Sequence, residues 1–438
     1  MNSWGRLNFF QRMMLRWREL HSYNPVHVVR VPTPLEPERL RACIAARLES
    51  LGLTGFAVDQ PRWSYRYEGG PAVVELSVES GGSDPLAALS RMIEREFNRP
   101  FPSARRVNPF RFFAIDEAGA FQLALVYDHY VASGDSIARL LTSIACSVAR
   151  PKTAPPATPM ERYSATYRSV LLRHPLWVIR AILGLPRMVA TARRAYRPRY
   201  ANVEDTYNAY TYLRVGPPQM GVLIGTAKAF GVTLNELLMA CLMLVLSPLA
   251  AGRRRERRRN ELAVASILNM RRDFRPDAHE ALSPFLAAIR VSHIVPDGID
   301  LRQLAQDVHA EMTRIRRRRL YLQSLMALAV SALLWPLLTV SQRHGFYPKH
   351  FPVWAGITAL NVNAIWAEAE CADMAGLDYL RAVPTGPLCP MVFAVTTAHD
   401  VLHVGIAYRT AAYSRATVDG LTAEFVRSID RLGVEPSP

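Results

Sequence analysis

The sequence predicts a mixed α/β (α+β) protein built from two halves. Runs rich in β-branched residues alternate with apolar-periodic helical segments through the first 149 residues, which is the pattern of this fold class. The 438 residues suffice for two domains or two pseudo-symmetric halves with ample core. A proline-rich stretch, ARPKTAPPATP, separates them. We therefore expect an N-terminal half over residues 1–150, a linker with a basic apolar segment over 151–204, and a C-terminal half over 205–438.

The first half contains four strand-like and three helix-like segments. Val26 begins a β-branched run, and Pro37 then precedes a helix. The apolar side chains of this helix share one face: Leu40, Cys43, Ile44 and Leu48. The remaining segments are strands over 72–80, 109–116 and 121–129, and helices over 85–100 and 136–149.

The second half opens with the strand YNAYTYLRV and the helix GVTLNELLMACLMLVLSPLA, which begins near Thr233 or Asn235. The charge run GRRRERRR that follows is typical of a solvated loop. The strand ELAVASILNMRRDF leads into paired arginines. From residue 356 onward the pattern predicts a strand, a loop, a strand hairpin and a final helix.

The formal net charge of +16 limits the classes of partner. Such a field suits nucleic acid, an anionic membrane surface, or an acidic protein or substrate. The chain has no zinc-finger spacing and no RNP-type aromatic motif, and its arginine clusters lie beside apolar helices. We therefore expect no nucleic-acid partner. The sequence also contains no metal-ligand constellation, G-x-S-x-G elbow or phosphate-binding glycine loop.

The five cysteines are scattered and include no C-x-x-C pair, and most are expected to be buried thiols in apolar surroundings, in a reducing compartment. The first seventeen residues lack the apolar core and cleavage site of a signal peptide. We expect a cytoplasmic, monomeric protein.

The stretch LALVYDHYVASGDSIARLL contains the main candidate for catalysis. A strand-like run ends in Asp128 and His129, a short turn contains Ser133, Gly134 and Asp135, and an apolar-periodic helix follows. A neutral imidazole can accept a proton from a hydroxyl or amine, because its pKa lies near physiological pH. A lone histidine at a strand end is more often structural, so the surrounding motif decides between the two interpretations.

This stretch resembles the HHxxxDG motif of the coenzyme A-dependent acyltransferases, a superfamily that includes condensation domains of non-ribosomal peptide synthetases, chloramphenicol acetyltransferase and the wax ester synthase/diacylglycerol acyltransferases. Further segments resemble the family in the family's order along nearly the whole chain: EFNRPF…NPFRFFAI, GVTLNELLMACLMLVL, ASILNMRRDF, ALNVNAI and TTAHDVLHVGIAYRTAAYS. The resemblance implies two chloramphenicol-acetyltransferase-like halves that form a V, with a channel between them for a thioester and an acceptor.

The resemblance also implies roles for single residues. His129 would be the general base, Gly134 would allow the tight turn, and Arg271 would brace the histidine loop. Asn361 and Asn363 in ALNVNAI are candidates for binding substrate. No metal or bound cofactor is implied. The co-substrate would be acyl-CoA or an acyl-phosphopantetheine carrier, and the basic surface would receive CoA phosphates or an acidic acyl carrier protein.

Two motif positions depart from the family. Asp128 replaces the first histidine, which some branches of the superfamily also lack. Ser133 replaces the aspartate that pairs with the arginine, and serine cannot form that ion pair. Because a buried unpaired arginine is costly, we expect Arg271 to pair with Asp135 or Asp128. Asp135 also suits a second interpretation, as an acid in the first turn of the helix.

Two apolar, arginine-rich segments raise the question of membrane contact. Residues 167–200, broken by Pro175 and Pro186, contain no acid. They fit either a connecting segment with solvated arginines or a membrane-surface helix. In the second interpretation, the side chains that enter lipid are Leu172, Leu176, Ile179, Leu183 and Met188. The side chains that contact headgroups are Arg173, Arg180, Arg187 and Arg193.

Residues 314–340 include about twenty nearly uncharged positions after a polybasic run, which is long enough to span a bilayer. We nevertheless expect residues 320–340 not to cross. Residues 341–438 carry ALNVNAI and the closing hairpin, which must pack against the first half in this fold. The stretch is then buried or lies on the inner face of the membrane.

The sequence thus predicts a stand-alone, condensation-type acyltransferase of lipid or natural-product biosynthesis. It would move an acyl group from a CoA or acyl-carrier-protein thioester to a hydroxyl or amine, with His129 as base. The alternative is a catalytically degenerate condensation-fold protein that recruits partners in a biosynthetic pathway. Ser133 favours the alternative, and His129 opposes it.

Overall fold

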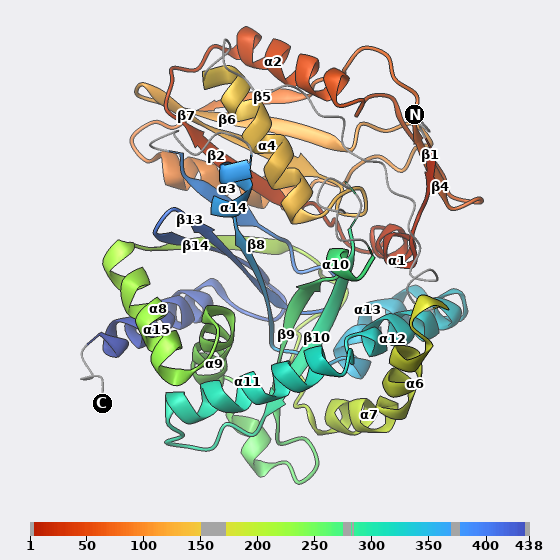
Figure 1. Cartoon of the computed structure of the whole chain (residues 1–438), viewed down its shortest axis with the longest axis vertical. Coiled ribbons are helices and arrows are strands. Elements are labelled where there is room, and N and C mark those ends of the chain that lie inside the picture. The colour runs from red at the N-terminus through yellow and green to blue at the C-terminus, as the bar shows by residue number, and fades with distance from the viewer. Residues whose placement is uncertain (1–3, 150–171, 275–281, 283, 369–376, 434–438) are drawn as a thin grey trace.

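Two lobes make up the structure, each built on a β-sheet with helices packed against it (Figure 1). The computed structural model describes residues 4–149, 172–274, 282, 284–368 and 377–433. Helices and strands mix in both lobes, and the predicted α/β (α+β) class is confirmed.

A five-stranded sheet with the order β12-β2-β7-β6-β5 forms the centre of the N-terminal lobe. Its middle strand, β7, is buried along its whole length. Helices α2 and α4 pack on one face and α3 on the other. The strands are β2 (Val26–Val31), β5 (Leu76–Ser80), β6 (Phe110–Glu117), β7 (Ala120–Tyr127) and β12 (Tyr379–Ala382). The helices are α2 (Pro37–Ser50), α3 (Pro85–Phe97) and α4 (Gly134–Ala149).

The strand predicted over 72–80 is shorter than expected, because its parallel pairing with β6 starts only at Leu76. The lobe also contains elements that the sequence pattern did not predict. They are helix α1 (Phe9–Trp17) and the three-stranded sheet of β1 (Trp4–Arg6), β4 (Ser64–Tyr67) and β3 (Phe56–Asp59).

A six-stranded sheet with the order β10-β9-β11-β13-β14-β8 forms the C-terminal lobe. Its strands are β8 (Asn208–Val215), β9 (Leu262–Asn269), β10 (Leu286–His293), β11 (Ala355–Asn361), β13 (Met391–Ala398) and β14 (Val401–Arg409). Its longer helices are α8 (Pro217–Phe230), α9 (Leu234–Leu246), α11 (Leu301–Arg317) and α15 (Arg415–Leu432). Thr233 is the N-cap of α9 and forms a capping box with Glu236, as one of the two predicted starts requires.

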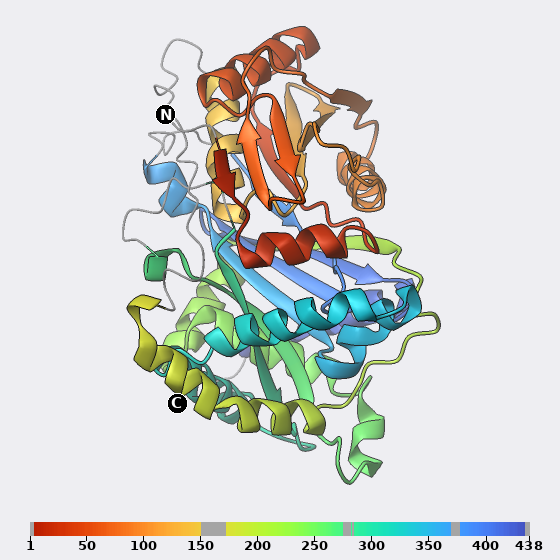
Figure 2. The same ribbon diagram turned by 90° about the vertical axis from the view of Figure 1, so that its right-hand side faces the viewer.

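Short helices occupy one side of the molecule, where Figure 2 shows α12 running beneath α1 with α6 and α7 beside it. They are α6 (Pro175–Leu183), α7 (Leu185–Arg194), α12 (Leu322–Leu334), the 3-10 helix η3 (Trp335–Leu337) and α13 (Val340–His350). The remaining short elements are η1 (Ala251–Arg255), α10 (Arg271–Phe274) and α14 (Asn363–Glu368).

The stretch 320–340 is divided among α12, η3 and the start of α13. Among the described residues no single helix has the length and hydropathy to span a bilayer, whereas three bent helix pairs meet these criteria by length and composition. Strands from both sides of 320–340 pair within the same six-stranded sheet. That 320–340 does not cross a membrane stays a prediction, and the shared sheet is consistent with it.

Two expectations about local environment need correction. The charge run 252–259 is largely exposed, as expected, but Arg253 is buried and donates hydrogen bonds to the carbonyls of Ser247 and Val295. These acceptors lie on neighbouring segments and leave no trace in the charge run itself. Cys146 is disulfide-bonded rather than a free thiol. The sequence did not reveal this bond, because a disulfide can join cysteines that lie far apart along the chain. Cys43, Cys241 and Cys389 are free, and Cys371 lies outside the described residues.

Strand β12 belongs to the C-terminal half of the sequence but pairs antiparallel with β2 of the N-terminal sheet. It crosses β14 at Gly405, where an added Cβ would lie 2.2 Å from the carbonyl oxygen of Arg381. The two backbones can approach this closely only because residue 405 has no side chain. The predicted division of the chain into halves at residue 150 does not account for this strand, which crosses from one half to the sheet of the other.

We predict that Gly405→Ala lowers the free energy of unfolding by roughly 1–3 kcal/mol or more, because the new methyl group would force β12 away from β14. Gly420→Ala is the matched control, since no atom lies within 4 Å of its added Cβ. That change in the interior of α15 should stabilise the protein by about 0.5–1 kcal/mol. Urea unfolding measures both, and equal stability of the two variants would contradict the close crossing.

Candidate active site

His129 lies in the loop between the end of β7 and the start of α4. Its backbone N–H donates to the carbonyl of Tyr23 (3.2 Å), and its ring packs against those of Tyr23 and Tyr127. The side chain is buried, with 8% exposed. The loop therefore holds the imidazole in a defined place between aromatic side chains.

The Nδ1 atom of His129 lies 3.4 Å from the carbonyl oxygen of Ala132. A carbonyl can only accept, so this long hydrogen bond favours the tautomer with the proton on Nδ1 and leaves the lone pair on Nε2. Burial lowers the pKa of His129 to about 4; the hydrogen bond to Ala132 opposes this shift, and the charge of Arg381 adds a smaller contribution to it. The imidazole is therefore neutral at physiological pH, which is the protonation state that a general base requires.

Arg271, at the start of α10 after β9, reaches across to the first turn of α4. Its Nε lies 2.9 Å from a carboxylate oxygen of Asp135, and its Nη2 lies 2.5 Å from the hydroxyl oxygens of both Ser133 and Ser136. The Ser133 hydroxyl donates in turn to Asp135 (2.6 Å). The prediction that Arg271 finds another carboxylate in this loop is confirmed, and Asp135 is that carboxylate.

Asp128 was the second predicted partner of Arg271, and that alternative was wrong. Its carboxylate forms an ion pair with Arg18, the C-cap residue of α1. Both side chains are buried, and Arg18 also donates to the carbonyl of Pro102 (3.2 Å). Burial raises the pKa of Asp128 to about 6, although the positive charge of Arg18 opposes this shift.

Gly134 does not have the left-handed backbone conformation that a tight turn would require. A Cβ at this position would lie 3.3 Å from Nη1 of Arg381 and 3.6 Å from the ring of His27. The glycine therefore provides space for these two side chains at the start of α4, and the predicted reason for it was wrong.

Arg381 is a buried residue of this region that the sequence reasoning missed. It lies on β12 and donates to the hydroxyl of Thr396 (3.0 Å) and to the carbonyls of Thr358 and Val395 (2.8 Å each). Burial lowers its pKa to about 10, which still leaves it charged at neutral pH. The sequence RAVPTGP gives no sign of this burial, because the acceptors lie on other strands.

Asn361 and Asn363 lie at the end of β11 and the start of α14. The side-chain oxygen of Asn361 accepts from the N–H of Asn363 (3.0 Å). Asn363 exchanges two hydrogen bonds with the backbone of His399, in the turn between β13 and β14. These contacts hold the hairpin turn against β11. A substrate-binding role for either asparagine stays a prediction.

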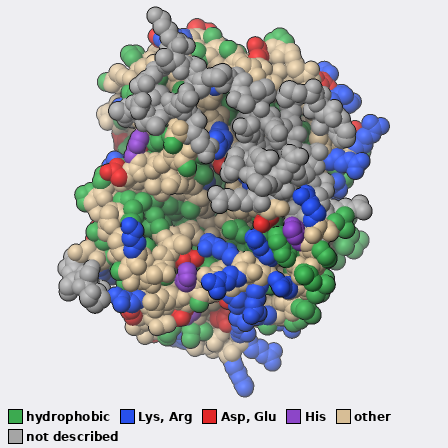
Figure 3. Space-filling view, in the orientation of Figure 1, with side chains coloured by type: hydrophobic (Ala, Val, Ile, Leu, Met, Phe, Trp, Pro, Cys, Tyr) green, Lys and Arg blue, Asp and Glu red, His purple; other side chains and the backbone are tan. Residues whose placement is uncertain are grey.

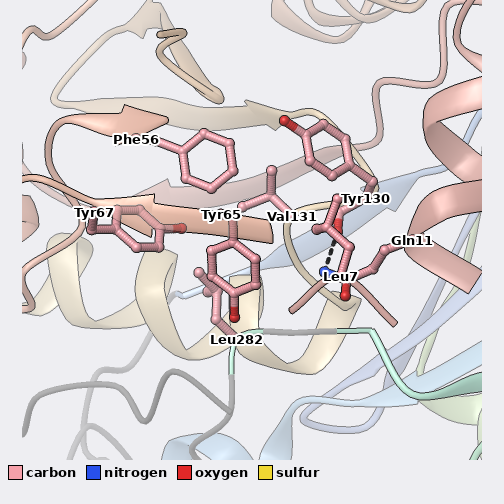
Figure 4. A pocket seen from close by; sticks show the side chains of 8 residues that line it. All are labelled: Leu7, Gln11, Phe56, Tyr65, Tyr67, Tyr130, Val131 and Leu282. Carbon is pink, nitrogen blue, oxygen red and sulfur yellow. Dashed lines mark hydrogen bonds between the residues drawn. The ribbon is translucent and has the colours of Figure 1, made fainter. Parts of the chain in front are cut away.

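Figure 4 shows a small pocket between the three-stranded sheet and the start of α1, with Tyr130 and Val131 in its wall. Aromatic and apolar side chains line it: Leu7, Gln11, Phe56, Tyr65, Tyr67, Tyr130, Val131 and Leu282. Tyr130 and Val131 directly follow His129, but His129 itself does not line the pocket. In the described part of the chain, no three His, Cys, Asp or Glu side chains are grouped to hold a metal ion.

No model of a known family matches the sequence, and no curated protein matches it. Several solved structures, by contrast, are similar to the fold of this chain. The first condensation domain of the CDA synthetase is 15% identical, with a TM-score of 0.71 over 100% of this chain and 98% of that one. The cyclization-docking bidomain of EpoB from Sorangium cellulosum is 13% identical, with a TM-score of 0.70 over 99% and 86%.

The X-domain from teicoplanin biosynthesis, solved in complex with OxyB, is 15% identical, with a TM-score of 0.61 over 100% and 95%. At these identities the likeness shows the fold. The chain has the two-lobed fold of these condensation-type domains, and the predicted fold is confirmed.

We predict that Asp135→Asn lowers the free energy of unfolding by about 3 kcal/mol, because it leaves the buried Arg271 guanidinium without its carboxylate. Glu424→Gln removes an exposed ion pair with Arg427 and should cost less than about 1 kcal/mol. Denaturant unfolding of both variants makes the comparison. A loss no larger for Asp135→Asn would show that the pair does not hold the lobes together.

We also predict that His129 titrates near pH 4. Since its unfolded-state pKa is about 6.5, the unfolded chain binds more protons between about pH 6.5 and 4. Stability is therefore lost as the pH falls through this window. NMR of the imidazole nitrogens, assigned with His129→Gln, should show a neutral ring protonated on Nδ1 from about pH 5 upward. A midpoint near 6.5 would refute the buried environment.

Proposed function

We propose that this protein transfers an acyl group from a thioester to a hydroxyl or amine, with His129 as general base. The observation that carries the proposal is the state of His129. Its ring is neutral, its Nδ1 is directed at the carbonyl of Ala132, and its Nε2 is left as the proton acceptor. The condensation-type fold supports the same reaction class.

In this reaction Nε2 of His129 takes the proton of the acceptor as its oxygen or nitrogen attacks the thioester carbonyl. The carbon–sulfur bond then breaks, and the departing thiolate receives the proton, so that an ester or amide and a free thiol result. The N-terminus of α4 and the Arg381 guanidinium place positive potential beside this loop. Such potential stabilises the oxyanion of the intermediate.

The thioester would be acyl-CoA or an acyl group on a phosphopantetheine carrier. Both donors carry negative charge, on phosphates or on an acidic carrier protein, and the net charge of +16 attracts either one. The channel between the lobes that the fold implies would bring donor and acceptor to His129 from opposite faces.

We predict that His129→Gln lowers thiol release from acyl thioesters by at least about 100-fold, since general-base catalysis contributes roughly 10²–10⁴-fold. The assay follows free thiol from a panel of acyl-CoA and acyl-phosphopantetheine donors with alcohol and amine acceptors. His350→Gln, at the exposed end of α13, is the control and should keep full activity. A His129→Gln variant as active as the wild type would exclude His129 as the base.

A second candidate function is recruitment of a partner protein without catalysis. The observation that favours it is Asp128, which is fixed to Arg18 at the first motif position, in a loop whose histidine is nearly covered. The X-domain with the same fold was solved in complex with a partner, OxyB. Tight binding of a carrier protein, with no turnover of any donor above the His129→Gln background, would favour this function over acyl transfer.

A further inference from the structure

Exposed aliphatic side chains are concentrated on the short helices that flank the C-terminal lobe. Eleven of the nineteen exposed large hydrophobic side chains in the described residues lie within 172–189 and 330–340. Leu183, Leu333 and Leu337 are each at least 75% exposed. Scattered single residues of this kind are normal on a protein surface, but a gathering of them marks an interaction site.

The two segments form one surface, which we call the apolar face. The side chain of Gln323 on α12 donates to the carbonyl of Ala181 on α6 (2.9 Å), and Arg319 lies over the ring of Trp177. Figures 1 and 2 place α6, α7 and α12 on the same side of the molecule. The exposed members are Leu172, Leu176, Ile179, Ile182, Leu183 and Val189, with Val330, Leu333, Leu334, Leu337 and Val340. Met188, expected among them, is half-buried.

The segments that form the apolar face carry basic residues and no acid of their own. Residues 172–203 contain seven arginines and no Asp or Glu, and residues 312–367 contain seven Lys or Arg and again no acid. Acids from neighbouring segments pair with some of these arginines: Glu311 with Arg187 and Arg314, Glu236 with Arg316, and Asp273 with Arg319. Figure 3 shows Lys and Arg side chains gathered on the lower part of this view, with hydrophobic side chains beside them at the right-hand edge. Within the described chain, the exposed side chains of Arg180, Arg317 and Arg318 have no acidic partner.

Other helix surfaces differ from the apolar face. On α15, on the opposite side in Figure 1, Arg427 and Arg431 both pair with Glu424, and on α2 Arg39 pairs with Glu36. These surfaces mix both signs and satisfy their own arginines. The basic excess with unpaired arginines therefore coincides with the exposed aliphatic side chains.

We propose that the apolar face docks on an anionic lipid bilayer. Aliphatic side chains would enter the boundary between headgroups and acyl chains, and the surrounding arginines would contact lipid phosphates, as in interfacial amphipathic helices. A protein partner fits less well, since the centres of protein interfaces are enriched in aromatic residues and Met, whereas the exposed apolar side chains here are Leu, Ile and Val. This inference is independent of the acyl-transfer chemistry.

Vesicle flotation of the full chain tests the proposal. The protein should float with vesicles of phosphatidylglycerol and phosphatidylcholine, bind vesicles of phosphatidylcholine alone at least about tenfold more weakly, and be released by high salt. Leu333→Ser with Leu337→Ser, and separately Arg317→Glu with Arg318→Glu, should each weaken binding by roughly tenfold or more. All four side chains are exposed, so thermal unfolding should be unchanged.

Two control variants match these changes elsewhere. Val73→Ser with Leu86→Ser removes exposed hydrophobic residues from the N-terminal lobe, and Arg427→Glu with Arg431→Glu makes the same charge change on α15. Both should bind vesicles as the wild type does. The proposal fails if the wild type does not float, or if controls and test variants lose binding equally. It also fails if sedimentation reveals a dimer that Leu333→Ser with Leu337→Ser disrupts and no vesicle binding occurs.

Discussion

The contact between Arg271 and the first turn of α4 joins the two lobes at the candidate active site. A buried guanidinium needs several acceptors to offset its lost hydration, and this one finds Asp135, Ser133 and Ser136 within a single turn. Because α4 starts directly after the histidine loop, a shift of β9 against the N-terminal sheet would move that loop. The position of His129 therefore depends on how the lobes pack.

A second buried arginine makes the packing of the lobes harder to change. Arg381 comes from the C-terminal half on β12, pairs with the N-terminal sheet through its backbone, and bonds to strands of the other sheet through its side chain. It also approaches Gly134 at the start of α4. The start of α4 is thus bonded to Arg271 of α10 and lies against Arg381 of β12, and both arginines connect the two lobes.

The sequence predicted what depends on local pattern and on the cost of burying charge. The alternating runs located β6 and β7, and the loss of the motif aspartate at Ser133 led to Asp135 as the partner of Arg271. The partner of Asp128 could not be found in this way. Arg18 lies 110 positions earlier, on a helix without a motif, and nothing in its neighbourhood distinguishes it from the other arginines of the chain. The burial of Arg381 could not be predicted for the same reason, since its acceptors lie on strands distant in the sequence.

Helix α1 connects the apolar face to the histidine loop. Residues two positions apart on a helix point to different sides, so Arg16 and Arg18 contact different parts of the molecule. Arg16 donates to the carbonyl of Ala332 on α12 (2.8 Å), and Arg18 holds Asp128 beside His129. The orientation of the apolar face relative to the loop is thus fixed by two contacts of one short helix. A lipid bilayer bound at α12 would therefore have a defined position relative to His129. An acyl donor or acceptor delivered from that bilayer would approach the histidine loop from one direction.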